Sequence, residues 1–161
     1  MLAADECIGA GLVVPELPPE VKTDLRRFNP VAGTSLRNPV DTPATTFARP
    51  DALAATVRAV AGWSGIDVLM VAFPVLFGLF MGLDYLLDGF RAVIETASEM
   101  GKPVAIILAT ENTAEGEIKA WELQKHCFRQ GAPVYLTFAQ AARAVNHLVG
   151  YHERQAPGAW H

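Results

Sequence analysis

Three short runs of β-forming, almost wholly apolar residues limit what this chain can fold into. The first run is Ile66–Phe73, and the other two are Pro103–Ala109 and Pro133–Thr137. Runs with so few polar residues are typical of strands that are covered on both faces, as in a parallel sheet. Helical patterns lie between the runs, and strands that alternate with helices predict right-handed β-α-β crossovers in an α/β fold.

Amphipathic spacing, acidic residues at helix starts and glycine at helix ends predict six helices. They are expected at Leu2–Ala10, Glu20–Phe28, Asp51–Ala61, Asp84–Met100, Ala114–Arg129 and Phe138–Tyr151. After the first helix, Leu12–Leu17 predicts a short edge strand, because Pro15 cannot donate a ladder hydrogen bond. Asn29–Pro50 predicts a long irregular connection, of a kind that often carries function.

The most apolar stretch of the chain is Val68–Leu83, which contains no charged residue. A helix that spans a membrane needs about 20 apolar residues, and this stretch is shorter and is interrupted by Pro74. We expect a strand, a loop and a buried helix here. Two interpretations of Val75–Leu87 stay open, which are packing in the core and contact with another subunit or domain.

Composition agrees with one domain that has a proper core, because 51% of the 161 residues are hydrophobic. A net charge of -4 without a basic stripe gives no reason to expect nucleic-acid binding. Cys7 and Cys127 lack disulfide and metal-site spacing and predict two buried thiols. Adjacency of His126 to Cys127 is too little for a catalytic pair. Without a signal-peptide pattern, we expect a cytoplasmic protein with no membrane partner.

The predicted order of elements lacks a first strand. A doubly wound sheet normally opens with a strand, and the glycine turn after that strand receives a phosphate. Here the helical pattern begins at Leu2. We therefore expect that the first strand and its glycine loop are missing, or that another chain supplies them. We expect one domain over residues 1–153 and a flexible tail over residues 154–161.

Several short motifs, taken in order, resemble one family. They are Met1–Cys7, Gly11-Leu12, Pro15–Leu17, Asn38–Asp41, Gly101–Val104, Gly131–Tyr135 and Ala141–Tyr151. The set resembles the flavodoxin-like ligase domain of NDP-forming (ADP-forming) acyl-CoA synthetases, which are relatives of succinyl-CoA synthetase. The resemblance covers about residues 1–153 and rests on the order of the motifs, since none is specific alone. It implies a three-layer flavodoxin-like α/β fold with a parallel sheet, and a Gly-Gly-x-Gly turn immediately before Met1.

The family joins a carboxylic acid to CoA and converts ATP to ADP and phosphate, through an acyl phosphate and a phosphohistidine. None of the four histidines of this chain has the context of the phosphohistidine motif. The resemblance therefore implies one component of an acid–thiol ligase, which is inactive alone and binds no cofactor alone. Its partners would be the ATP-grasp and CoA-binding domains or subunits, which use CoA and ATP or ADP with Mg²⁺. We also expect a homo-oligomer.

By resemblance, substrate contacts come from three loops at the carboxyl end of the sheet. Asn38 and Asp41 match a motif near the acyl pocket, and Glu111 and Asn112 match a turn after the second strand. The alternatives are a turn that only shapes the loop, for Asn38, and helix capping, for the acidic residues of the turn. The resemblance assigns no catalytic residue and no metal ligand to this chain.

The third loop begins at Pro74 and Val75 and departs from the family pattern. Over Pro74–Phe80 it is longer and far more apolar than the glycine-rich loop of the family. A pocket built from it should prefer an apolar or aromatic acid, because burying a second carboxylate among such residues is costly. The alternative is a segment that only fills the core.

A different class of function also fits the sequence. The chain lacks a phosphate loop and a complete catalytic constellation. A non-catalytic interaction or oligomerisation module, which docks through Val75–Leu87, is therefore the second hypothesis. A stand-alone nucleotide binder is the third, and it is weaker because the first βα turn would have to bind the phosphate.

Overall fold

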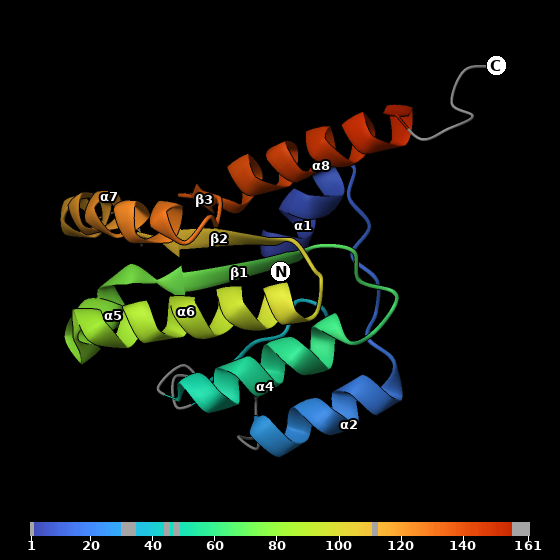
Figure 1. The fold of residues 1–161 in the computed structure, drawn as a ribbon, viewed down its shortest axis with the longest axis horizontal. Helices are drawn as coiled ribbons and strands as arrows, with labels where there is room; N and C mark the ends of the chain where they lie inside the picture. The colour runs from blue at the N-terminus through green and yellow to red at the C-terminus, as the bar shows by residue number, and fades with distance from the viewer. Residues whose placement is uncertain (1, 30–34, 44–45, 47–48, 111–112, 156–161) are drawn as a thin grey trace.

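The computed structural model describes residues 2–29, 35–43, 46, 49–110 and 113–155. Within these ranges the chain forms an α/β fold, with seven helices around a small, open, all-parallel sheet of three strands (Figure 1). The architecture is compatible with a flavodoxin-like fold. The three predicted strands are confirmed as β1 (Leu69–Pro74), β2 (Val104–Ala109) and β3 (Val134–Tyr135), in the spatial order β1-β2-β3.

β1 and β2 are paired over their full length, from Leu69 opposite Val104 to Pro74 opposite Ala109. The two strands therefore end at the same level. Only two residues of β3 join the ladder.

β3 is shorter than predicted because the helix that follows it takes up its next backbone groups. The Leu136 N–H donates to Gln140 Oε1 at 3.2 Å, and the Gln140 N–H donates to Thr137 Oγ1 at 3.1 Å. This reciprocal arrangement caps a helix start and stops the strand at Tyr135.

All six predicted helices are present, with small shifts at their ends. They are α1 (Leu2–Gly9), α2 (Pro19–Phe28), α4 (Pro50–Ala61), α6 (Leu83–Glu99), α7 (Ala114–Arg129) and α8 (Phe138–Gln155). Because α8 continues to Gln155, the first two residues assigned to a flexible tail are helical. Residues 156–161 lie outside the described ranges.

A seventh helix lies within Val68–Leu83, where a strand, a loop and a buried helix were expected, but the expected loop is missing. α5 (Val75–Met81) begins directly after β1, so the strand passes into a helix without an intervening loop. Its seven residues are too few to span a bilayer, and no helix in the described ranges is long and apolar enough to cross a membrane.

The helices cover both faces of β1. On one face, the Cys7 thiol of α1 donates to the Met70 sulfur at 3.6 Å, and α1 packs beside α8 (Figure 1). On the other face, the rings of Phe73 and Phe90 meet edge to face at 4.5 Å, which places α6 there. Met70 and Phe73 are three residues apart in a strand, and side chains at odd spacing point to opposite faces. α4 packs on α6, and α2 packs on α4.

The predicted edge strand at Leu12–Leu17 is wrong. The segment links α1 to α2 without helix or strand, with Val13 86% exposed and Leu17 buried. Pro15 lacks a backbone donor, and so does Pro18 directly after the segment. The Pro15 carbonyl accepts a hydrogen bond from a side chain instead of from a strand. The missing first strand stays a prediction, since β1 is an edge strand in the described sheet.

A buried polar network joins the long connection to the helices. Asn29 is 2% exposed, and its Nδ2 donates to Thr56 Oγ1 of α4 at 3.2 Å. Thr46 Oγ1 donates to Asn29 Oδ1 at 2.9 Å. Leu36 and Val40 pack against the core. The described part of the connection is irregular, as predicted, and is fixed at several points.

Candidate functional site

The carboxyl ends of β1 and β2 form the edge at which the sequence places a binding site. Pro74 and Ala109 are paired there, and α/β proteins bind ligands at this edge. Val75 follows Pro74 and has no exposed surface, so its side chain is a core residue. Pro74 is half-buried at the end of β1 and remains the candidate contact of the two. Glu111 and Asn112 lie outside the described residues.

Tight packing fixes α5 against α6 beside this edge. Gly78 permits the contact, since a Cβ at this position would lie 2.2 Å from Leu86 Cγ. Next to it, the rings of Phe77 and Tyr85 meet edge to face at 6.3 Å. Phe80, at the far end of α5, is 87% exposed. The segment expected to be an apolar substrate loop is therefore a packed helix with one free aromatic ring.

Tyr85 is a candidate residue that sequence reasoning missed. Its hydroxyl is buried and has no hydrogen-bond partner among the residues that the structure describes. Desolvation raises the pKa of Tyr85, so the phenol stays protonated and keeps a donor. A buried hydroxyl without a partner is unusual in a folded protein. The sequence held one signal for Tyr85. It carries the one hydroxyl group in the apolar stretch Val75–Leu87, three residues after Gly82.

Asn38 is anchored away from β1. Its Nδ2 donates to the Pro15 carbonyl at 3.1 Å and so ties the connection to the segment between α1 and α2. Asp41 is exposed, and its backbone N–H donates to the Ser35 carbonyl at 2.8 Å. Within the described ranges no hydrogen bond links Asn38 or Asp41 to Pro74. The structure thus gives Asn38 a loop-shaping contact, which reaches across 23 residues.

The start of α7 is tightly built. Thr113 Oγ1 accepts a hydrogen bond from the Gly116 N–H at 3.1 Å and caps the helix. A Cβ at Gly116 would lie 2.4 Å from the Thr110 carbonyl oxygen. Glu115 is exposed in the first turn, where a negative charge favours the helix. These contacts fix the backbone at the start of α7.

Both cysteines are free and buried, as predicted. Burial raises the pKa of the Cys127 thiol to about 11, and it also raises the pKa of Cys7. A nucleophilic cysteine needs a depressed pKa and access to its target. Cys127 has neither, so its pairing with His126 carries no chemistry.

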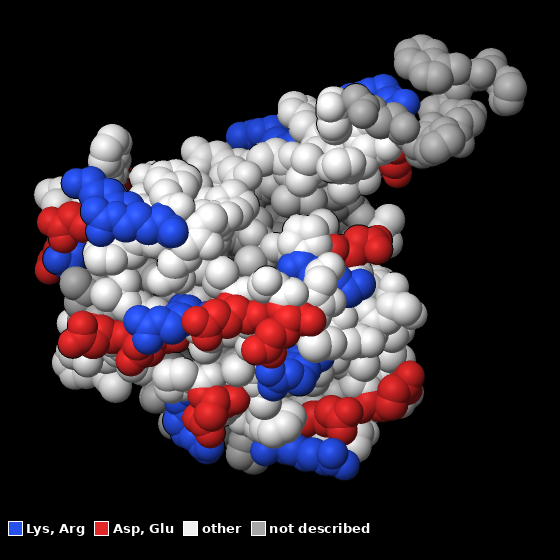
Figure 2. All heavy atoms as spheres, in the orientation of Figure 1, with Lys and Arg blue, Asp and Glu red and all other residues white. Residues whose placement is uncertain are grey.

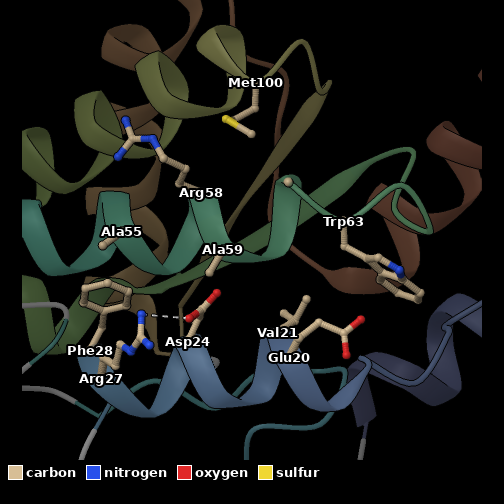
Figure 3. A pocket seen from close by; sticks show the side chains of 11 residues that line it. Glu20, Val21, Asp24, Arg27, Phe28, Ala55, Arg58, Ala59, Trp63 and Met100 are labelled. Carbon is tan, nitrogen blue, oxygen red and sulfur yellow. Dashed lines mark ion pairs between the residues drawn. The ribbon is translucent and has the colours of Figure 1, made fainter.

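A groove of about 620 Å³ lies between α2 and α4 (Figure 3). Glu20, Trp63 and Met100 line it, and none of the predicted site residues does. Asp24 and Arg27 on its wall form an ion pair at 3.1 Å, visible as the dashed line in Figure 3. This groove is thus separate from the strand ends, and part of its charged wall is already paired.

Within the described ranges, no group of three or more His, Cys, Asp or Glu side chains could hold a metal ion. The fold and the site define an α/β protein with a candidate ligand edge at the ends of its parallel strands. Comparisons with protein-family models, curated proteins and solved structures found no significant match.

Proposed function

We propose that this chain is the flavodoxin-like ligase domain of an NDP-forming acyl-CoA synthetase and forms part of its acyl site. One observation carries the proposal. The ordered motifs that resemble the family include Gly101–Val104 and Gly131–Tyr135, which lead into β2 and β3 of a parallel sheet. The segment that begins at Pro74 follows β1 at the edge where such folds bind ligands.

The acid substrate we propose is apolar or aromatic. The segment that follows the candidate edge carries Phe77 and Phe80, and a second carboxylate would lose its hydration among such residues. The buried Tyr85 hydroxyl, beside the Phe77 ring, is the donor we assign to the single carboxylate of such an acid. Asn38 would act by holding its loop to Pro15.

The partners we propose are ATP-grasp and CoA-binding domains or subunits in the cytoplasm. ATP with Mg²⁺ and CoA would bind in those partners. The described residues offer no group of three or more His, Cys, Asp or Glu side chains for a metal. We therefore assign neither cofactor to residues of this chain, and we expect no ligase activity from the chain alone.

The test begins with purification of the tagged chain from its host, followed by mass spectrometry of the proteins that remain bound. Recovery of an ATP-grasp subunit supports the proposal. Acid-dependent formation of acyl-CoA by the recovered complex is then measured with and without the chain. Full activity of the partners in the absence of this chain would overturn the proposal.

Two variants of the recovered complex test the site itself. Tyr85→Phe should raise the KM for the acid about tenfold, because one hydrogen bond to a charged group is lost. Asn38→Ala should lower activity by loosening its loop, whereas Arg37→Ala, at an exposed neighbour in the same loop, should not. Unchanged kinetics in both Tyr85→Phe and Asn38→Ala would exclude these residues from the acyl site.

The second candidate function is an interaction module without ligase chemistry. The observation that favours it is exposed apolar surface, since Phe80 is 87% and Met81 45% exposed at the end of α5. This function predicts an assembly that depends on Phe80, together with no binding of ADP or CoA by calorimetry. Loss of assembly in Phe80→Glu without loss of ligase activity would favour it.

A further inference from the structure

The outer face of α7 carries an apolar stripe that the fold leaves uncovered. Ile118 and Trp121 are each 67% exposed, and Phe128 is 60% exposed. With Lys125, these residues recur at spacings of three and four, which places them along one side of a helix. The opposite side of α7 packs on the domain through Ala120, Leu123 and Cys127. The residues of the stripe therefore do not contribute to the hydrophobic core of the domain.

Charge along α7 is divided between its ends. Glu115 and Glu117 lie in the first turn, and Arg129 lies in the last turn, with Lys125 one turn before it. Lys119 and Glu122, between the ends, neutralise one another at 2.6 Å. Figure 2 shows both signs of charge over the position that α7 occupies in Figure 1. A second α7 laid antiparallel would meet opposite charge at both ends, whereas a parallel one would meet like charge.

We propose that α7 is a homodimer interface, in which two copies pair antiparallel about a twofold axis near Leu123. In this register Ile118 of each copy packs on Phe128 of the other, and Trp121 packs on Lys125, since each pair is symmetric about position 123. Alternating spacings of three and four are the pattern of a two-helix seam, and here Lys125 takes one of the four positions. A lysine ammonium over an indole face adds a cation–π contact. At one flank, Arg129 of one copy lies within about one helical turn of Glu115 of the other, because that pair is centred on position 122. A second copy of this chain thus satisfies every group of the stripe.

The size of the stripe sets the expected affinity. A fully exposed large side chain offers about 150–250 Å², so the three apolar residues offer roughly 300–500 Å² per copy. An interface built on them lies at the low end of specific interfaces, so we expect a weak dimer with a Kd in the micromolar range. The inference does not depend on the proposed ligase function, since it uses surface residues of α7 alone.

The first experiment is sedimentation equilibrium on the full chain from about 1 to about 300 µM, a range that brackets the expected Kd. We expect the mass to rise from 17.3 kDa towards twice that value. Trp121→Glu should weaken the dimer at least about tenfold, as loss of a central aromatic anchor does. Phe80→Glu is the matched control, because Phe80 is even more exposed but lies on α5. A monomer at the highest concentration, or a dimer that responds only to Phe80→Glu, would overturn the proposal.

A charge exchange tests the antiparallel register. Glu115→Arg and Arg129→Glu should each weaken the dimer several-fold, and the double variant should restore it, because opposite charges again face each other. Circular dichroism of each variant controls for loss of helix, since both changes oppose the helix dipole. Additive weakening in a folded double variant would contradict the antiparallel pairing.

Discussion

α5 and α7 distribute their apolar residues in opposite ways. α5 has no charged residue, yet Val75 is fully buried and Gly78 lies against Leu86, so packing absorbs most of its apolar surface. α7 is rich in charge, yet it leaves Trp121 and Phe128 largely exposed. The helix with the more hydrophobic sequence, α5, is therefore not the helix that exposes more apolar surface. The exposed apolar surface depends on which side of each helix is covered by the sheet and the neighbouring helices.

The sharpest contrast should come from truncating one buried phenylalanine of α6, the helix on which α5 packs, and one exposed phenylalanine of α7. Phe90 of α6 is 1% exposed and packs edge to face on Phe73, so Phe90→Ala should lower the free energy of unfolding by about 3–5 kcal/mol. Phe128→Ala, on the exposed side of α7, should change it by less than about 0.5 kcal/mol. Urea unfolding at low protein concentration measures both. Similar losses in the two variants would show that α7's outer face is covered within the monomer.

Cys127 probes the buried side of α7. Its thiol has a pKa of about 11 in the folded chain against an ordinary value of 9.0. The unfolded chain releases the thiol proton at a lower pH than the folded chain does. The contribution of Cys127 to the free energy of unfolding is therefore complete below about pH 9 and is lost as the pH rises towards 11. The expected loss is roughly 2–3 kcal/mol. Unfolding measured from pH 8 to 11, a range set by these values, should show this decline in the wild type and a smaller decline in Cys127→Ala.

Cys7 provides the matched control for the pH series. Burial also raises the pKa of Cys7, but its side chain is 9% exposed and that of Cys127 is 1% exposed. Cys7→Ala should therefore remove less of the decline than Cys127→Ala. If the free energy of unfolding declined equally with pH in the wild type, Cys127→Ala and Cys7→Ala, neither thiol would have a pKa raised by the fold.

The strands and long helices were predictable because their patterns are local. β1, β2 and β3 are apolar runs bounded by proline and glycine, and α7 has a capping threonine with acidic residues in its first turn. α5 was not predictable in the same way, because a seven-residue apolar run fits a strand, a loop or a helix equally well. Its state depends on Gly78 packing against Leu86, which is a tertiary contact.

The candidate site also contains some features that local sequence predicts and others that depend on tertiary contacts. The position of Pro74 at the edge of the sheet follows from its place after a strand, and the sequence sufficed. The bond from Asn38 to Pro15 joins residues far apart in the chain, and the burial of Tyr85 depends on how α5 meets α6. Neither leaves a local pattern. Leu12–Leu17 was predicted as a strand from its β-forming residues, although a strand also needs a neighbour to pair with.

Gly78→Ala tests whether close packing removes α5 from the surface. The added Cβ would lie 2.2 Å from Leu86 Cγ, and overpacking of this kind costs about 1–3 kcal/mol. Alanine also favours a helix by about 1 kcal/mol, so the net loss should be up to about 2 kcal/mol. Gly9→Ala is the control, because nothing lies within 4 Å of a Cβ there, and it should be neutral or stabilising. Equal effects of the two changes in thermal unfolding would show that α5 does not pack closely on α6.

Tyr85→Phe should have the smallest effect on the free energy of unfolding. The sign of that effect shows whether the Tyr85 hydroxyl has a hydrogen-bond partner within the fold. Its hydroxyl is buried without a partner, so removing the oxygen should leave the free energy of unfolding unchanged or raise it by up to about 1 kcal/mol. Because desolvation raises the pKa of Tyr85, any stability it contributes is present below pH 10.0, its ordinary value, and is lost above it. Tyr151→Phe, at an exposed position, is the control. A loss of more than about 1 kcal/mol in Tyr85→Phe alone would mean that the hydroxyl has a partner within the fold. It would then not be free to meet a substrate carboxylate, and the apolar side of α5 would be a core element only.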